Sequence, residues 1–181
     1  MKFYTYTGKM IDMTSPSPDA IDIRDIAHAL SQICRASGHF KHFYSVAQHS
    51  INCLKEAIAR NYSEKVCLAC LLHDSQEAYL CDIPTPLKYH LPDYKKIENN
   101  FEEKVWEKFG IALSDYEKKL VKSVDEAILY YEFKKLHTIP ISFAHPPVLI
   151  SVPRVEYMDM KDVERLFISE FMSFGKIEKT A

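Results

Sequence analysis

The chain has 181 residues, of which 47% are hydrophobic and 27% charged, and its formal net charge is -2 at pH 7. This composition is typical of a water-soluble globular protein with a sizeable core. The near balance of acidic and basic residues gives no electrostatic reason to expect a nucleic-acid or membrane partner. The first residues, MKFYTYTGKMIDM, lack the pattern of a secretory signal. No apolar run approaches the ~20 residues that span a bilayer, so we expect a cytoplasmic protein.

Helical patterns occupy most of the chain. Residues 1–20 predict an irregular or hairpin-like segment that ends in the turn-rich TSPSPDA. Beyond it, the spacing of apolar residues predicts helices over 22–36, 45–61, 63–80, 94–110, 114–136 and 161–175. Only four glycines are present, and no internal repeat or linker divides the chain. The sequence therefore predicts one all-α domain over 1–181.

Prolines mark the segments that we expect to be loops. Pro84, Pro86 and Pro92 predict that no helix forms over 82–93. A second proline-broken loop is expected over 137–154.

Five cysteines are present, and Cys67 and Cys70 form a CxxC pair. No second CxxC completes a structural zinc site, and both thiols fall in an apolar run where a free cysteine packs as a small hydrophobic residue. An odd number of cysteines without a secretory signal favours reduced thiols over a disulfide framework.

Ionisable residues interrupt apolar helical segments at three places. His73, Asp74 and Glu77 follow the apolar run KVCLACLL, and their i, i+3 and i+4 spacings place them on one side of a helix. His49 shares a face with apolar residues of its own helix. Asp125 lies within the apolar stripe of LVKSVDEAILYY, which predicts a core position. A buried carboxylate is costly unless it is paired or binds a metal.

Two interpretations of these residues are open. They are either a satisfied core histidine, a surface His–Asp pair and a buried capping aspartate, or they form one site. Because they are predicted to point inward from three long helices, we favour one site. His49, His73, Asp74 and Asp125 would together bind a divalent transition metal, since two imidazoles and two carboxylates suit Mn, Fe, Co, Ni or Zn.

The ordered set His49, His73-Asp74 and Asp125, in LLHDSQEAYLCDIPTPLK and VKSVDEAI, resembles the HD-domain metal-dependent phosphohydrolases. It is similar in particular to the small bacterial and phage hydrolases of the 5′-deoxynucleotidase type, over nearly the whole chain. The resemblance implies a compact HD-domain helical bundle, commonly a homodimer or larger assembly, that binds a nucleotide. It also implies that these four residues are the metal ligands.

The resemblance implies roles for other residues as well. Glu77 and Asp82 match the acidic pair that orients or deprotonates the attacking water. Arg35 matches the arginine that holds the substrate phosphate, and Lys88, in PTPLK, matches a basic residue near that phosphate. In the deoxynucleotidases resembled, a bulky aromatic residue follows the arginine and helps to select the sugar. Here Ala36 follows it, which puts a strong preference for deoxyribose in doubt.

Hydrolysis of a phosphate ester needs charge neutralisation at the phosphoryl oxygens and a nucleophile available near neutral pH, and a divalent ion supplies both. The resemblance, with which this chemistry is consistent, implies a metal-dependent phosphohydrolase, most simply one that removes the 5′-phosphate of (deoxy)nucleoside monophosphates. The alternatives are a dNTP triphosphohydrolase and a non-catalytic, nucleotide-binding regulatory HD domain. Retention of all the metal and acidic residues favours an enzyme.

Five further side chains have two interpretations each. His39 and His42 either line the phosphate pocket or a second metal position, or are exposed loop residues. Tyr44, Tyr79 and Tyr89 either stack on a base or belong to the core and rim.

Overall fold

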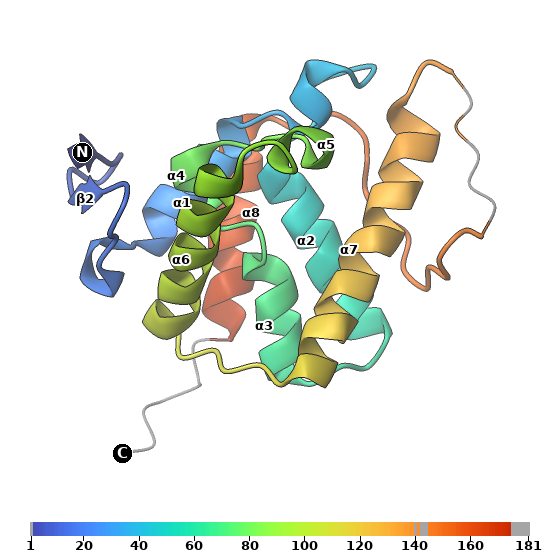
Figure 1. Cartoon of the computed structure of the whole chain (residues 1–181). Coiled ribbons are helices and arrows are strands. Elements are labelled where there is room, and N and C mark those ends of the chain that lie inside the picture. The colour runs from blue at the N-terminus through green and yellow to red at the C-terminus, as the bar shows by residue number, and fades with distance from the viewer. Residues whose placement is uncertain (1, 140, 142–144, 175–181) are drawn as a thin grey trace.

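A computed structural model describes residues 2–139, 141 and 145–174 (Figure 1). Strands β1 (Lys2–Tyr4) and β2 (Met10–Asp12) form an antiparallel hairpin in which Phe3 pairs with Ile11. The helices are α1 (Ile23–Gln32), α2 (Val46–Ala59), α3 (Glu64–Leu72), α4 (Glu77–Leu80), α5 (Thr85–Lys88), α6 (Pro92–Lys108), α7 (Asp115–Leu136) and α8 (Met160–Ser173). Short 3₁₀ helices cover Pro18–Ala20 and Arg35–Gly38. The helical architecture and the N-terminal hairpin are as predicted.

Helix α2 lies at the centre of the helical assembly and packs against α1, α3, α7 and α8. Figure 1 shows α2 and α3 side by side, with α7 along one flank and α8 on the other, partly behind α6. Buried apolar side chains from all of these helices form one cluster, which includes Ile26, Leu54, Leu71, Val124 and Phe167. Cys67 and Cys70 pack in this cluster as free thiols, as predicted. A polar residue on the inner faces of α2, α3 and α7 is therefore brought close to the other two helices.

Side-chain caps set where the central helices begin. The Ser45 hydroxyl accepts a hydrogen bond from the backbone N–H of Gln48 at the start of α2. Ser114 and Glu117 form a reciprocal capping box at the start of α7. Such caps pair backbone N–H groups that have no acceptor within the helix.

Two of the predicted helices end earlier than the apolar pattern indicated. The first ends at Gln32, and Arg35 lies in the following 3₁₀ turn, where Ala36 has a φ of 51°. The helix predicted over 63–80 breaks after Leu72. The backbone N–H groups of Ser75 and Glu77 bond to carbonyls three residues back, so this turn is tighter than an α-helix. Gly175, the predicted end of the last helix, lies outside the described residues.

The prediction that no helix forms over 82–93 was wrong. Helix α5 occupies Thr85–Lys88 with Pro86 in its first turn, and α6 begins at Pro92. Proline is tolerated there because the first N–H groups of a helix have no partner to lose.

The segment that leads from α7 back to α8 runs along α2. The side-chain amides of Gln48 and Asn52 donate to the carbonyl of Arg154 at 3.1 and 2.9 Å. Glu56, one turn further along α2, accepts from the backbone N–H of Ser151 at 2.7 Å. All three side chains are buried, so α2 anchors this segment through a polar stripe. Among the described residues, no helix is both long and apolar enough to cross a membrane.

Candidate metal centre

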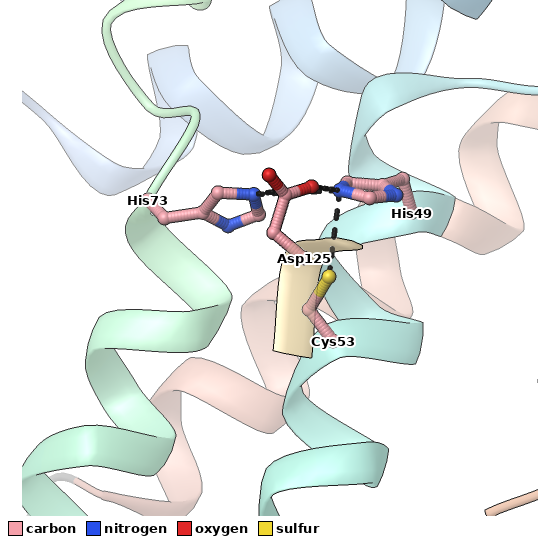
Figure 2. Close-up of side chains that lie close together, drawn as sticks. All are labelled: His49, Cys53, His73 and Asp125. Atoms are coloured by element: carbon pink, nitrogen blue, oxygen red, sulfur yellow. Dashed lines mark hydrogen bonds and ion pairs between the residues drawn. The ribbon is translucent and has the colours of Figure 1, made fainter. Parts of the chain in front are cut away.

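Four side chains from α2, α7 and the turn after α3 converge between these helices. The Nε2 atom of His49 lies 3.3 Å from Nε2 of His73 and 3.1 Å from Oδ1 of Asp125. Oδ2 of Asp74 lies 3.2 Å from Nε2 of His73 and 3.7 Å from Nε2 of His49. Figure 2 shows the Asp125 carboxylate between the two imidazole rings. The structure thus brings the four predicted metal ligands together.

Both imidazoles are oriented by a hydrogen bond on the side away from the cluster. Nδ1 of His49 donates to Oε1 of Glu132 at 2.8 Å, and Nδ1 of His73 donates to the carbonyl of Cys70 at 2.9 Å. Because a carboxylate and a carbonyl oxygen only accept, each ring carries its hydrogen on Nδ1 when neutral. The Nε2 lone pairs are therefore directed into the cluster, as metal-binding histidines require.

The spacing of these atoms fits a transition metal ion. Donor atoms about 2.1 Å from a tetrahedrally coordinated ion lie about 3.4 Å from one another. The donor–donor distances in the cluster are 3.1, 3.2, 3.3, 3.7 and 3.7 Å. Burial alone would raise the pKa of Asp74, but His73, His49 and Arg35 lower it below its usual value. Its carboxylate is therefore ionised and able to bind a cation at neutral pH.

Cys53 is a further donor that was not predicted. It lies one turn after His49 (Figure 2), with Sγ 3.4 Å from Nε2 of that histidine. Donor atoms of His49, Cys53, His73 and Asp125 all lie within 4.8 Å of one another. Burial and the nearby Asp125 raise the pKa of the Cys53 thiol well above its usual value in the metal-free protein. Asp74, which is ionised and close to both imidazoles, stays the predicted fourth ligand, and Cys53 is its rival.

Asp125 is less buried than its place in the apolar stripe indicated. Its side chain is 34% exposed, whereas Val124 and Ile128 are fully buried. The apolar stripe of α7 passes beside Asp125, which lies at its edge. The carboxylate is therefore accessible from the surface as well as from the cluster.

Glu132 is a buried carboxylate at the centre that no pattern in the sequence had singled out. Its side chain is fully buried, and Oε1 accepts from the Tyr44 hydroxyl at 2.7 Å as well as from His49. Oε2 lies 3.3 Å from Nε of Arg35. Burial favours the neutral form, but His49 and Arg35 lower the pKa of Glu132, so it is ionised. The sequence feature that could have identified Glu132 is its position two turns after Asp125 on the same helix face.

A cavity of about 420 Å³ adjoins the cluster. Its charged lining residues were all predicted to act on metal, water or phosphate: Arg35, Asp74, Glu77, Asp82, Lys88 and Asp125. Nη1 of Arg35 donates to Oδ2 of Asp74 at 3.3 Å. Nζ of Lys88 lies 3.6 Å from Oε1 of Glu77 and 2.5 Å from Oε1 of Glu98. Positive groups able to bind a phosphate and carboxyl groups able to move a proton thus line the same cavity.

Glu77 has the surroundings of a proton-transfer group. Its side chain is 5% exposed, and its Oε2 has no hydrogen-bond partner among the described residues. Burial, together with Asp74 and Asp82, raises the pKa of Glu77 well above its usual value. Burial likewise raises the pKa of Asp82. A carboxyl group with a raised pKa is suited to exchange a proton near neutral pH.

The histidines of the loop after Arg35 are not among the described residues that line this cavity. His39 is exposed at the end of the 3₁₀ turn. Nε2 of His42 pairs with the carbonyl of Val155 at 2.9 Å, which ties the loop to the segment before α8. His39 therefore fits the interpretation as an exposed loop residue, whereas His42 is partly buried and bonded to the backbone, which neither interpretation had described.

The three tyrosines also fit the core and rim interpretation. Tyr44 is buried and bonded to Glu132, and Tyr79 stacks on Phe101 in the core with ring centroids 5.3 Å apart. Tyr89 is 75% exposed.

Comparison with known proteins identifies the family. A family model described as 5′-deoxynucleotidase YfbR-like matches residues 26–135, a span that contains every residue of the centre described above. The uncharacterized protein YfdR of Escherichia coli (strain K12) is 35% identical over 98% of this chain and 97% of its own length. A Rhodobacter capsulatus protein, RCAP_rcc00048, is 34% identical over 66% of this chain and 64% of its own length. A protein of Yersinia pestis (strain Pestoides F) named 5′-deoxynucleotidase is 34% identical over 38% of this chain and 43% of its own length. The chain therefore belongs to the YfbR-like 5′-deoxynucleotidase family, as the ordered histidines and aspartates had indicated.

Proposed function

We propose that this protein is a metal-dependent phosphohydrolase that removes the 5′-phosphate from nucleoside monophosphates. The observation that carries the proposal is the cavity beside the His49, His73, Asp74 and Asp125 cluster, because it combines two cationic side chains with a buried carboxyl group of raised pKa. Membership of a 5′-deoxynucleotidase family supports the same reaction.

The four clustered side chains would hold one divalent ion. When bound, such an ion polarises a phosphoryl oxygen and lowers the pKa of a water molecule beside it. The donor set suits Mn, Fe, Co, Ni or Zn alike.

Arg35 and Lys88 would bind the phosphate. The guanidinium of Arg35 offers paired N–H donors that match two phosphate oxygens, and its contact with Asp74 keeps it next to the cluster. Lys88 adds a point charge from the other side of the cavity, next to Glu77. The substrate phosphate would therefore lie between the cluster and α5.

Glu77 would accept the proton of the attacking water. It lines the cavity together with Asp74, and its unpartnered Oε2 leaves an acceptor for that water. Asp82, whose pKa is also raised, would share or orient this proton.

The remaining walls of the cavity suit a monophosphate of a nucleoside. Ile83, Pro84, Thr85 and Pro86 also line the cavity, and we expect this proline-rich segment to leave room for one phosphate rather than a triphosphate chain. Leu129 and Phe133 of α7 give an apolar surface for the nucleoside. Ala36 also lines the cavity, and its small side chain leaves space near the sugar. We therefore expect a modest preference for the deoxy sugar. From the family resemblance we also expect a homodimer or larger assembly.

Two alternatives stay in competition with this proposal, since a dNTP triphosphohydrolase and a regulatory nucleotide-binding domain would use the same cluster. A screen of nucleoside mono-, di- and triphosphates with separate Mn²⁺, Co²⁺, Zn²⁺ and Ni²⁺ additions, with products identified by ³¹P NMR, separates the three. We expect inorganic phosphate and nucleoside from monophosphates. Intact triphosphate released from a dNTP would support the first alternative, and nucleotide binding without turnover would support the second.

A further inference from the structure

Glu132 contacts both halves of the centre, and the proposed reaction gives it no task. We propose that Glu132 is a positioning residue that holds the metal ligand His49 and the phosphate-binding Arg35 in fixed relation to each other. This inference rests on the proposed function of the site, and it adds a residue that neither touches the substrate nor ligates the ion.

The first contact fixes His49. Oε1 of Glu132 accepts from Nδ1 of His49 at 2.8 Å, and both side chains are fully buried. A carboxylate in this position sets the ring orientation and makes the opposite nitrogen a better donor to a cation. The opposite nitrogen, Nε2, is the atom that faces His73 and Asp125.

The second contact fixes Arg35. Oε2 of Glu132 lies 3.3 Å from Nε of Arg35, while Asp74 accepts from Nη1 of the same guanidinium. The Glu132 contact is an ion pair, since Oε2 has no hydrogen-bond partner among the described residues, and the Asp74 contact is a hydrogen bond. Two carboxylates next to two different nitrogens hold the guanidinium in place between them. The side chain of Arg35 is 10% exposed and lines the cavity, so the guanidinium is held there before a phosphate arrives.

Together the contacts form a closed ring of charged groups. Glu132 links His49 to Arg35, Arg35 contacts Asp74, and Asp74 Oδ2 lies 3.7 Å from His49 Nε2. Tyr44 fixes Glu132 itself through a 2.7 Å hydrogen bond. A change at any member therefore alters the geometry of both the donor cluster and the phosphate site.

The competing explanation is that Glu132 only stabilises the fold. Buried ion pairs often contribute little net stability, because desolvation offsets their attraction. Glu56 provides a matched control, since it is also fully buried and ionic but bonds to Arg60, Ile150 and Ser151. Replacing Glu56 or Glu132 by glutamine removes one buried charge, from α2 or α7 respectively. Of these two glutamates, Glu132 is the one that contacts His49 and Arg35.

The test uses Co²⁺ and inorganic phosphate as probes of the full-length protein. Three metal-stripped proteins are compared: the wild type, Glu132→Gln and Glu56→Gln. Each is titrated with Co²⁺ while its visible absorption is recorded, and each Co²⁺-loaded protein is then titrated with phosphate. We expect Glu132→Gln to raise the Kd for Co²⁺ by about 10- to 100-fold, to change the Co²⁺ spectrum and to weaken phosphate binding. Glu56→Gln is expected to lower Tm with both affinities unchanged. Arg35→Lys keeps the positive charge but loses the paired N–H donors, so it should weaken phosphate binding more than Co²⁺ binding.

Wild-type affinities and an unchanged spectrum in Glu132→Gln, with only a lower Tm, would overturn the inference. If the glutamine variant does not fold, Glu132→Asp replaces it, because the shorter side chain keeps the charge but cannot span from His49 to Arg35. Wild-type Co²⁺ and phosphate affinities in that variant would equally overturn it. Neither probe depends on turnover. If the wild type hydrolyses no nucleotide but Glu132→Gln weakens Co²⁺ and phosphate binding, only the proposed reaction is contradicted. If the wild type is active but Glu132→Gln binds Co²⁺ and phosphate as the wild type does, only this inference is contradicted.

Discussion

Asp74 and Arg35 join the donor cluster to the proposed phosphate site. Oδ2 of Asp74 lies 3.3 Å from Nη1 of Arg35 and also 3.2 Å from Nε2 of His73. The same oxygen is thus shared between an arginine that would bind substrate and a histidine that would bind metal. Metal affinity and phosphate affinity are expected to depend on each other through this carboxylate.

Asp74 and Cys53 are the two candidates for the fourth metal ligand, and replacing each by alanine shows which of them binds the ion. Asp74→Ala is expected to lose the metal and the activity, because it removes an ionised donor close to both imidazoles. Cys53→Ala should keep both, since it leaves the ionised Asp74 in place. Elemental analysis of each protein, purified without added metal and then after chelation and reloading, measures the difference. Full metal content in Asp74→Ala together with loss of metal in Cys53→Ala would reverse the assignment.

Glu77→Ala should separate catalysis from metal binding. Glu77 lines the cavity without taking part in the donor cluster, so the variant is expected to keep its metal. Loss of a general base typically lowers the rate by about 10²–10⁴-fold. Steady-state rates normalised to bound metal give the measurement. If Glu77→Ala loses the ion instead, Glu77 is a ligand and the division of roles is wrong.

The pH dependence of stability should change sign when metal is added. Burial disfavours the charged imidazole of His73, but Asp74 and Asp125 outweigh it and raise its pKa well above 6.5 in the metal-free protein. The pKa of His49 is raised as well. The folded state then holds more protons than the unfolded state above pH 6.5, so the free energy of unfolding falls as the pH rises through the folded-state pKa.

A bound ion replaces those protons, so metal affinity and the stabilisation that it gives increase with pH over the same window. Urea unfolding between about pH 6 and pH 8, with chelator and with excess Mn²⁺, measures both trends. We expect the two unfolding free energies to diverge as the pH rises. A metal-free protein that becomes more stable with rising pH would show that these histidines are not held near the carboxylates as described.

Ala36 is expected to set the tolerance for ribose. Ala36→Trp should fill cavity space beside Leu129 and Phe133 and lower kcat/KM for AMP more than for dAMP. Ala36→Gly is the matched control, because glycine also adopts the φ of 51° and adds no bulk. The ratio of kcat/KM for dAMP and AMP is compared across the three proteins. A ratio unchanged by tryptophan would place the sugar elsewhere.

The sequence was sufficient to predict the helical architecture and the convergence of His49, His73, Asp74 and Asp125. Helical spacing places each residue on an inner face, and the order of the residues matches the family. Apolar spacing alone did not reveal the break after Leu72, because the helical pattern continues through the polar residues of that turn. The exposure of Asp125 likewise depends on which neighbours cover the edge of α7, and this is a property of the tertiary structure.

Glu132 shows why the centre could be predicted only in part. It follows Asp125 on the same face of α7, yet LYYEFKKL reads as an ordinary amphipathic helix end. Its role depends on Tyr44 and Arg35, which approach from a separate loop. Cys53 was likewise not predicted, because its closeness to His49 depends on the side-chain conformations of the folded helix.

The most direct test of the proposed metal-dependent hydrolysis is a metal titration of the chelator-stripped protein with simultaneous measurement of bound Mn²⁺ and of phosphate released from dAMP. We expect no release without metal, a rate that increases in proportion to occupancy up to one ion per chain, and no release from Asp74→Ala at any Mn²⁺ concentration. Phosphate release by the fully stripped protein, or by Asp74→Ala at the wild-type rate, would contradict it.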